Sequence, residues 1–363
     1  MYAAPMRVAA VMVALALGTS AAAAGCGGSE GPPTWVKPGV YRGTVGTQAV
    51  NLAIRKEGTD LTGAYFYERR KVDLPLTLGR RGETLVAQEE VWSGPEAGLK
   101  VTGCLTLAPN GAGLKGQWRR PDGGQPLPVT LAPLEVTRLP LNLPDSPGLR
   151  KLRTSDPLAF LKLNRPWVPS PDRTSIREPL TGLTYPRVPG GSAALNAALQ
   201  DRQLLHAAYA LGCRSQLGDA PAGGDGYTLT ARVTFRRPQL LSVTENAGYY
   251  CGGAHPEAFD VGLILDRASG REVPVTAIWP GLTAPRLNSL YLARVKAEAD
   301  CREALTDRAP TFTANLTPAG LAVTPTGLPH VVFACAQTII LPYASLRAWA
   351  DPKGPYFRDL YSR

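Results

Sequence analysis

Short alternating runs of apolar and polar residues, separated by glycine-rich turns, fill the chain between residues 39 and 131. In the clearest run, Val50, Leu52 and Ile54 alternate with their neighbours, the period of two that is typical of a strand with one buried face. Similar runs follow at 41–45, 64–67, 74–78, 85–92, 101–107, 114–118 and 127–131. About eight strands without a helical pattern predict a small antiparallel β-barrel or sandwich over residues 38–133.

Two alternatives exist for the interior of such a barrel. An eight-stranded barrel is wide enough to hold one small ligand, or it can be filled by its own side chains. The fold alone does not decide between a small-molecule-binding barrel and a purely structural domain.

Prolines crowd the next segment, residues 134–173. Proline fixes φ and removes a backbone donor, which excludes a central strand or a helix interior here. The segment also contains Leu158, Phe160 and Trp167, which make it too apolar for a solvated linker. We therefore predict a proline-rich connector that lies against both neighbouring domains.

The second half of the chain, residues 174–363, mixes helical and strand periods. Ser192 can cap a helix that continues to Gly212, and a second helix is predicted over 286–305. Strands are predicted at 227–235, 240–243, 259–265, 272–275, 312–316, 321–323 and 331–341, with a short closing segment at 343–349. Hairpins with intervening helices predict an α+β domain, in which helices pack on a mostly antiparallel sheet. The expected fold class of the whole chain is β followed by α+β.

The N-terminus has the features of a secretory signal peptide over residues 1–25, because Arg7 precedes an apolar run and a stretch of small residues. The apolar run is shorter than the ~20 residues that cross a bilayer as a helix. Its end, Ala-Ala-Gly followed by Cys26, resembles the lipobox of bacterial lipoproteins, with alanine where leucine is usual. The resemblance implies lipidation at Cys26 and a flexible tether over residues 26–37, with ordinary signal-peptide cleavage as the alternative.

The formal net charge of the chain is +10. In an exported protein, this basicity indicates anionic envelope polymers or phospholipid head groups as partners, and no nucleic acid. We expect a protein of the bacterial cell envelope, anchored to the membrane through Cys26 and facing the periplasm or the exterior.

One short stretch, residues 249–257, brings together a thiol, an imidazole and a carboxylate in Cys251, His255 and Glu257. Two glycines between the cysteine and the histidine indicate a turn. In an oxidising compartment, Cys251 is expected in a disulfide rather than as a catalytic nucleophile. We therefore interpret the stretch as a shaped loop.

Other catalytic signatures are sparse. The chain contains three histidines and no metal-binding motif, so we predict no metal site and no cofactor. Hydrolysis by paired carboxylates near the 245–266 loop stays open, because the separation of such groups in space is not visible in a sequence.

The run Tyr250-Cys251-Gly252-Gly253-Ala254-His255-Pro256, followed by a strand, Asp266 and a turn at Gly270, resembles the RsiV-type domain. This is the extracellular lysozyme-sensing domain of an anti-sigma factor, and it also occurs at the C-terminus of some peptidoglycan deacetylases. The resemblance covers about residues 174–363 and implies a surface that binds lysozyme or a cell-wall component. The chain departs from the family by having no sigma-binding segment, no membrane helix and no deacetylase domain, so neither signalling by proteolysis nor deacetylation is implied.

The loop and its flanks supply the residues expected to contact a partner, namely Tyr249, Tyr250, Gly252, Gly253, His255, Pro256 and Glu257. Tyrosine gives a large contact area at low entropic cost and is enriched at binding hot spots. His255 is either a hydrogen-bonding contact or a residue that bonds its own loop. Five carboxylates stand against two arginines between residues 245 and 272, which allows a basic partner here.

Six cysteines are present, four of them in the second half. Those four allow three pairings, and we favour Cys213–Cys251 and Cys301–Cys335, each of which joins the end of a predicted helix to a later element. Cys104 has no partner if Cys26 is lipidated, and we expect it to be a free thiol.

Overall fold

The computed structural model describes residues 24–94, 98–217, 226–252, 255–307 and 310–362. The predicted signal peptide falls almost entirely outside these ranges. Within them, no helix is both long enough and apolar enough to cross a membrane.

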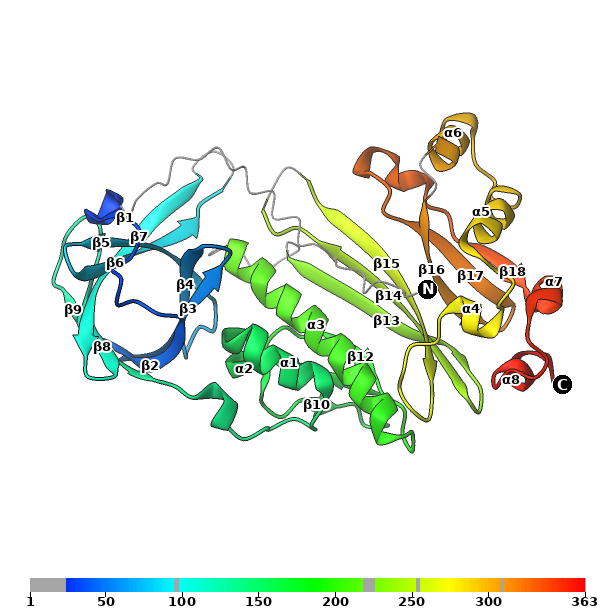
Figure 1. Cartoon of the computed structure of the whole chain (residues 1–363), viewed down its shortest axis with the longest axis horizontal. Helices are drawn as coiled ribbons and strands as arrows, with labels where there is room; N and C mark the ends of the chain where they lie inside the picture. The colour runs from blue at the N-terminus through cyan, green and yellow to red at the C-terminus, as the bar shows by residue number, and fades with distance from the viewer. Residues whose placement is uncertain (1–23, 95–97, 218–225, 253–254, 308–309, 363) are drawn as a thin grey trace.

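Eight antiparallel strands form the first domain, and each lies where the alternating pattern predicts one. They are β2 (Gly39–Val45), β3 (Gln48–Glu57), β4 (Asp60–Tyr67), β5 (Leu74–Arg81), β6 (Thr84–Trp92), β7 (Leu99–Asn110), β8 (Gly113–Arg119) and β9 (Leu127–Pro133). Each strand pairs with its sequence neighbours, and β9 pairs with β2, so the sheet closes into a barrel (Figure 1). The prediction of a small antiparallel barrel is confirmed.

Alternate residues of every strand point into the barrel and fill it. Val45, Leu52, Tyr65, Leu105 and Val129 are each at most 2% exposed. This arrangement is what the period of two requires, because every second side chain faces the same side of a strand.

The chain before the barrel is bound to it. We call residues 26–37 the N-terminal strap. Its short strand β1 (Ser29–Glu30) pairs with β5, Trp35 donates its indole N–H to the carbonyl of Glu83 at 2.8 Å, and Val36 is buried in the barrel core. The prediction of a flexible tether is therefore wrong, because its apolar residues and its backbone both have partners on the barrel.

The exclusion of a helix interior from the connector is wrong, because the connector contains two short helices, α1 (Pro147–Ser155) and α2 (Pro157–Leu163). Each begins with proline at a position where no backbone donor is needed, and the side chains of Ser146 and Asp156 cap them. A small sheet follows, formed by β10 (Val168–Pro169), β11 (Ser175–Arg177) and β12 (Thr184–Pro186). As expected, the connector lies against both neighbours: Leu158 packs on the barrel, and Phe160 packs on the long helix described next.

A 25-residue helix, α3 (Ala193–Leu217), organises the second half. Ser192 caps it as predicted, since its hydroxyl accepts from the backbone N–H of Leu195 at 3.0 Å. The helix crosses the sheet of β13 (Tyr227–Arg236), β14 (Leu240–Tyr249) and β15 (Glu257–Asp266), as Figure 1 shows. Leu199 packs against Leu241 and Val243 of that sheet.

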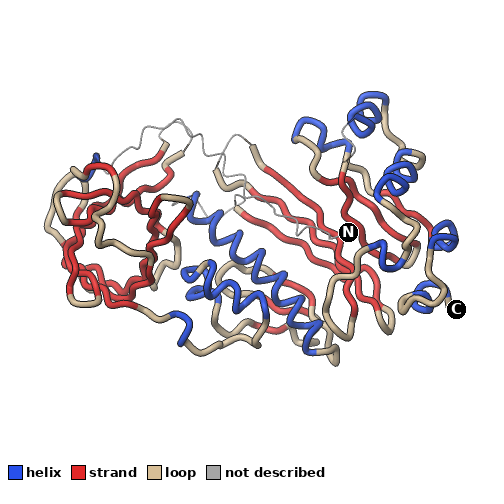
Figure 2. Tube along the Cα trace, viewed as in Figure 1, coloured by secondary structure: helices blue, strands red, loops and turns tan. Residues whose placement is uncertain are grey.

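A second three-stranded sheet completes this half and consists of β16 (Thr311–Thr317), β17 (Gly320–Thr326) and β18 (Ile339–Pro342). Gly262 of β15 approaches β16 so closely that a Cβ atom there would lie 2.4 Å from the carbonyl carbon of Ala314, so only glycine fits. The surrounding helices are α4 (Val275–Ile278), α5 (Ala284–Leu292), α6 (Ala299–Asp307), α7 (Tyr343–Leu346) and α8 (Phe357–Tyr361). The predicted class of β plus α+β is confirmed, and Figure 2 shows the distribution of helix and strand.

Three predicted elements of this half differ from the structure. The helix over 286–305 is two helices, because Arg302 of α6 donates to the carbonyls of Leu292 and Val295 and so ends α5. The predicted strand at 331–341 begins as a 3₁₀ helix, η3 (His330–Cys335), whose end is bound to α6 by a disulfide. The strand at 272–275 is reduced to a single bridge between Leu265 and Glu272, since α4 begins directly after Pro274.

All six cysteines lie in the described part of the chain, and all are paired. The predicted disulfides Cys213–Cys251 and Cys301–Cys335 are confirmed. The expectation of a free thiol at Cys104 is wrong, because Cys104 is bonded to Cys26. That bond uses the sulfur that a lipid at Cys26 would need.

A buried ion pair joins the barrel to the connector. The ammonium of Lys162 on α2 is fully buried and lies 2.5 Å from a carboxylate oxygen of Asp73, which follows β4. It also lies 5.1 Å from the centre of the Phe66 ring. The backbone N–H of Asp73 donates to the hydroxyl of Ser215 on α3. The two halves are thus connected by packed, hydrogen-bonded groups as well as by the chain itself.

Candidate functional site

The predicted loop lies at one end of the sheet β13–β15, between the end of β14 and the start of β15. Cys251 has no thiol, since it is bonded to Cys213 of α3. Gly252 has φ of +82°, which favours glycine, and it lies beside the indole of Trp92 on barrel strand β6. Gly253 and Ala254 fall outside the described residues. The disulfide and the positive φ indicate a loop with a fixed backbone conformation. The disulfide also excludes Cys251 as a thiol nucleophile.

Tyr249 belongs to a row of aromatic rings on the α3 side of the sheet, which we call the aromatic row: Tyr209, Tyr227, Tyr249 and Phe259. Tyr249 lies directly opposite Tyr227 in the strand register, with ring centres 6.1 Å apart and nearly parallel planes. Its ring meets the edge of Phe259 at 6.2 Å. Tyr209 extends the row from α3 and is 39% exposed. The row therefore has an accessible end beside the predicted loop.

The remaining loop residues lie at the margin of this row. Tyr250 donates its backbone N–H to the carbonyl of Gly226, which holds the end of β14 against the residue before β13. His255 Nδ1 lies 3.2 Å from the carboxylate of Glu257, and both side chains are 42% exposed. His255 Nδ1 also lies 3.2 Å from the carbonyl of Pro256. A pair this exposed contributes ~1 kcal/mol or less to stability. The imidazole is thus engaged with its own loop.

A buried polar cluster lies further along the same face of the sheet. We call it the Glu245 cluster, and it consists of Tyr185, Arg202, His206 and Glu245. Glu245 on β14 is fully buried, and its carboxylate accepts from the hydroxyl of Tyr185 and from the guanidinium of Arg202, at 2.9 Å for Nε. His206 Nε2 lies 3.0 Å from the same carboxylate.

The cluster is continuous with the aromatic row. The other nitrogen of His206, Nδ1, lies 2.6 Å from the hydroxyl of Tyr227, and its ring stacks on Phe259 at 6.2 Å. One face of the sheet thus leads from a buried carboxylate, through an imidazole, to partly exposed tyrosines.

The electrostatics of the cluster keep Glu245 ionised. Burial by itself would raise the pKa of Glu245, but the nearby imidazole of His206 and the hydrogen bonds and charge of the Arg202 guanidinium lower this pKa to about 2. Burial and the neighbouring carboxylate raise the pKa of Tyr185, which therefore stays a hydrogen-bond donor. A carboxylate that is ionised at neutral pH and bonded on both oxygens is not a general acid.

The other carboxylates near the loop also accept hydrogen bonds. Asp260 accepts from the side-chain amide of Asn246, and Asp266 accepts from the backbone and the hydroxyl of Ser269. These hydrogen bonds lower the pKa of Asp266. Nothing in this geometry favours the alternative of a hydrolase that uses carboxylates of the 245–266 loop.

Sequence reasoning missed the Glu245 cluster. It placed Glu245 among surface carboxylates, whereas the structure pairs it with Arg202 in the interior. The signal that could have found it is the alternation of β14, which puts Glu245 on the same face as Val243 and Ala247. A charged residue on the apolar face of a strand requires a buried partner.

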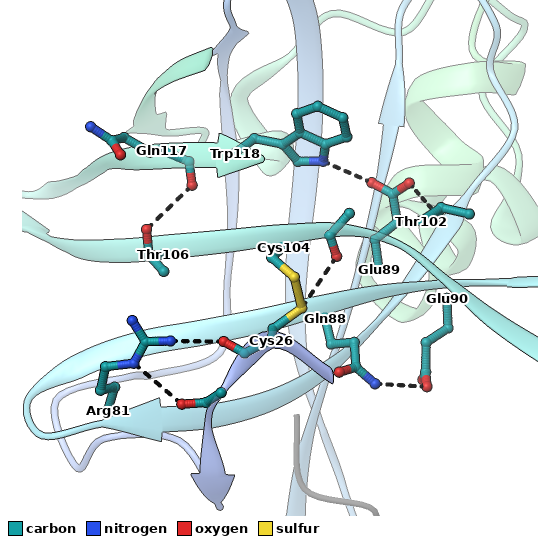
Figure 3. Close-up of a disulfide and its surroundings, with 12 residues drawn as sticks. Cys26, Arg81, Gln88, Glu89, Glu90, Thr102, Cys104, Thr106, Gln117 and Trp118 are labelled. Atoms are coloured by element: carbon teal, nitrogen blue, oxygen red, sulfur yellow. Dashed lines mark hydrogen bonds between the residues drawn. A yellow bond between two sulfur atoms is a disulfide. The ribbon is translucent and has the colours of Figure 1, made fainter. Parts of the chain in front are cut away.

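The barrel interior also contains a carboxylate, Glu89 on β6, which is 6% exposed. It accepts from the hydroxyls of Tyr65 and Thr102 and from the indole of Trp118, the last at 3.1 Å. Figure 3 shows the indole and the threonine directed at this carboxylate. A Cβ atom at Gly103 would lie 2.3 Å from the Trp118 indole nitrogen, so the side chains leave no spare room here. This packing favours the filled interior over a small-molecule carrier.

No group of three or more His, Cys, Asp or Glu side chains is arranged to hold a metal ion anywhere in the described ranges. The site is thus built from aromatic rings, hydrogen bonds and one disulfide.

Comparison with solved structures gives partial structural neighbours, among them two members of the DUF3298 family. No family model matches the chain, and no curated protein does. A member of the DUF3298 family from Bacteroides fragilis is 18% identical with a TM-score of 0.35, over 47% of this chain and 78% of its own. A DUF3298 protein from Pseudomonas aeruginosa is 16% identical with a TM-score of 0.27, over 44% of this chain and 71% of its own. Likeness at this level does not extend to function.

Proposed function

We propose that this protein is an exported envelope protein whose second half is a binding module, and that its partner docks on the aromatic row and the adjoining loop. The observation that supports this most directly is the partly exposed end of the row at Tyr209 and Tyr249, held next to the Cys213–Cys251 disulfide. Tyrosine side chains in a rigid setting give contact area at low entropic cost. Three disulfides agree with an oxidising compartment.

The proposed partner is lysozyme or a cell-wall component, as the resemblance of the loop to the RsiV-type domain suggests. The charge argument for a basic partner is weaker than the sequence indicates, because Glu245 is buried and paired with Arg202. Glu257 and Asp260 still present carboxylates near the loop, and aromatic rings suit a protein surface or a sugar face equally. Anchoring through a lipid at Cys26 competes with the Cys26–Cys104 disulfide for one sulfur.

The test compares the exported chain with a variant in which Tyr249, Tyr250 and His255 are all replaced by alanine. Binding to lysozyme is measured by biolayer interferometry, and binding to insoluble peptidoglycan by co-sedimentation. The triple variant should lose at least ~2 kcal/mol of binding free energy, about 30-fold in Kd, with little change in melting temperature.

The matched control is Ile340→Ala on β18, which removes a 46% exposed apolar side chain outside this face. The control should bind like the parent. If neither probe binds the parent, the proposed partners are excluded. If the triple variant binds as tightly as the parent, the aromatic row is not the docking surface.

A further inference from the structure

Cys26 and Cys104 occupy a small apolar site on the outside of the barrel. Their Cα atoms are 5.5 Å apart, and both residues are buried, at 9% and 5% exposure, against Val86 and Val101. Figure 3 shows the bond bridging the strap to strand β7. This separation falls in the range where two cysteines can be bonded without moving the backbone.

The residues around Cys26 also make hydrogen bonds that do not involve its sulfur. The guanidinium of Arg81 donates to the carbonyl of Cys26 at 2.8 Å and to that of Gly27 at 3.2 Å (Figure 3). Ser29 and Glu30 pair with Arg80 and Gly79 of β5. These hydrogen bonds hold the backbone of residues 26–30 against β5 and so place Cys26 next to Cys104.

The barrel also needs the strap. β4 and β5 pair only over three residue pairs, from Tyr65 opposite Leu74 to Gly63 opposite Leu76. Beyond that point, β1 takes the place beside β5, and Val36 enters the core. The strap therefore completes the wall where β4 turns away.

A sulfur atom of cysteine forms one covalent bond beyond its own side chain, so Cys26 carries either a disulfide or a thioether-linked lipid. A lipid at Cys26 would leave Cys104 as the one unpaired cysteine, in a chain whose other four cysteines are bonded. We propose that Cys26 is a structural disulfide cysteine, that its bond to Cys104 fixes the strap on the barrel, and that the mature chain carries no lipid at this sulfur.

The bond forms by thiol–disulfide exchange. The two thiols lose two electrons and two protons, and the oxidant is a disulfide-exchange protein of the exported compartment, which is reduced to its dithiol. The chemistry is the same as for the other two disulfides, so it requires no additional reactant. This inference does not depend on what the aromatic row binds.

The test is mass spectrometry of the full-length chain, expressed with its own leader in a bacterial host and extracted from whole cells with detergent. Thiols are first blocked with iodoacetamide without reduction, and the protein is then digested. We expect a cross-linked peptide pair containing Cys26 and Cys104, no alkylated Cys104, and no fatty-acid label in cells grown with radioactive palmitate. The Cys301–Cys335 peptide pair is the internal control for oxidation.

An N-terminal peptide with the mass of a diacylglyceryl group, together with alkylated Cys104, would overturn the proposal.

A second experiment measures hydrogen exchange in the Cys104→Ser variant. If the bond holds the strap, exchange at residues 26–31 should rise at least tenfold in the variant, while exchange in β7 stays within about twofold. Unchanged exchange over 26–31 would show that the bond does not fix the strap.

Discussion

Replacing Glu245 with glutamine tests whether the Glu245 cluster holds α3 on its sheet through an ionised carboxylate. Glu245→Gln keeps the shape of the side chain and removes the charge that Arg202 requires. The guanidinium then lacks its counter-ion in a setting where Glu245 is fully buried. Loss of one partner from a buried pair is strongly destabilising.

The magnitude follows from the pKa. Folding lowers the pKa of Glu245 from 4.5 to about 2, and each unit corresponds to about 1.4 kcal/mol, so the carboxylate contributes ~3 kcal/mol at neutral pH. Because the folded-state pKa is the lower one, this contribution is present above pH 4.5 and is lost as the pH falls towards 2. At pH 3, less than half of it should remain.

The assay is thermal unfolding, followed by circular dichroism at pH 7 and pH 3. For a domain of this size, ~3 kcal/mol corresponds to a Tm lower by about 6 to 12 °C at pH 7, and the difference should shrink by more than half at pH 3. Hydrogen exchange of β14 assigns the loss to this sheet rather than to the barrel.

The matched control is Glu257→Gln, which removes a carboxylate from the same sheet at an exposed position. That variant should stay within ~1 kcal/mol of the parent at both pH values. If Glu245→Gln is no worse than this control, or if its effect is equal at pH 7 and pH 3, the account of Glu245 as a stabilising buried anion is refuted.

Three further changes have defined outcomes. Tyr185→Phe removes a hydrogen bond to the ionised Glu245 and should cost about 1.5–3 kcal/mol in urea unfolding, whereas a loss below ~0.5 kcal/mol would contradict the assigned bond. Lys162→Ala leaves the Asp73 carboxylate without its cation and should lower the free energy of unfolding by about 3–5 kcal/mol, as measured by calorimetry. The Lys162→Ala, Asp73→Ala double variant should lose less. Replacing Cys213 and Cys251 together with serine opens a loop of 38 residues and should cost ~4 kcal/mol in denaturant, while equal stability would show that the bond is not needed.

Each strand of the barrel could be predicted because the pattern that defines it is contained in a few consecutive residues. A closed sheet with a filled interior requires every second residue to be apolar, and the turns between strands are short, so periodicity alone locates β2 to β9. Asn51 and Ala53 break the pattern by being buried on the outer face. The burial of Ala53 depends on Leu158 of α2, about a hundred residues later, which no local pattern contains.

The predictions that were wrong concern segments whose conformation depends on contacts with residues far away in the sequence. The helix predicted over 286–305 ends early because the Arg302 guanidinium donates to the carbonyl of Leu292 at the end of α5 and to that of Val295 just after it. The apolar run at 331–341 suggests one strand, but its first part is a 3₁₀ helix whose last residue is bonded to α6 by the Cys301–Cys335 disulfide. Of the candidate site, sequence located the loop and two disulfides, but missed the Glu245 cluster, whose members come from β12, α3 and β14.

The pairing of β2 with β9 has a consequence for how such a chain can be assembled from parts. Tyr41 near the start of the barrel lies opposite Pro133 at its end, so the chain enters and leaves the barrel on adjacent strands. A module whose two ends are neighbours can be excised or transplanted with a short splice. Removing the barrel would affect the connector, since Lys162 would lose both the Asp73 carboxylate and the Phe66 ring. A recombinant protein made of the connector and the second half should therefore carry an uncharged residue at position 162.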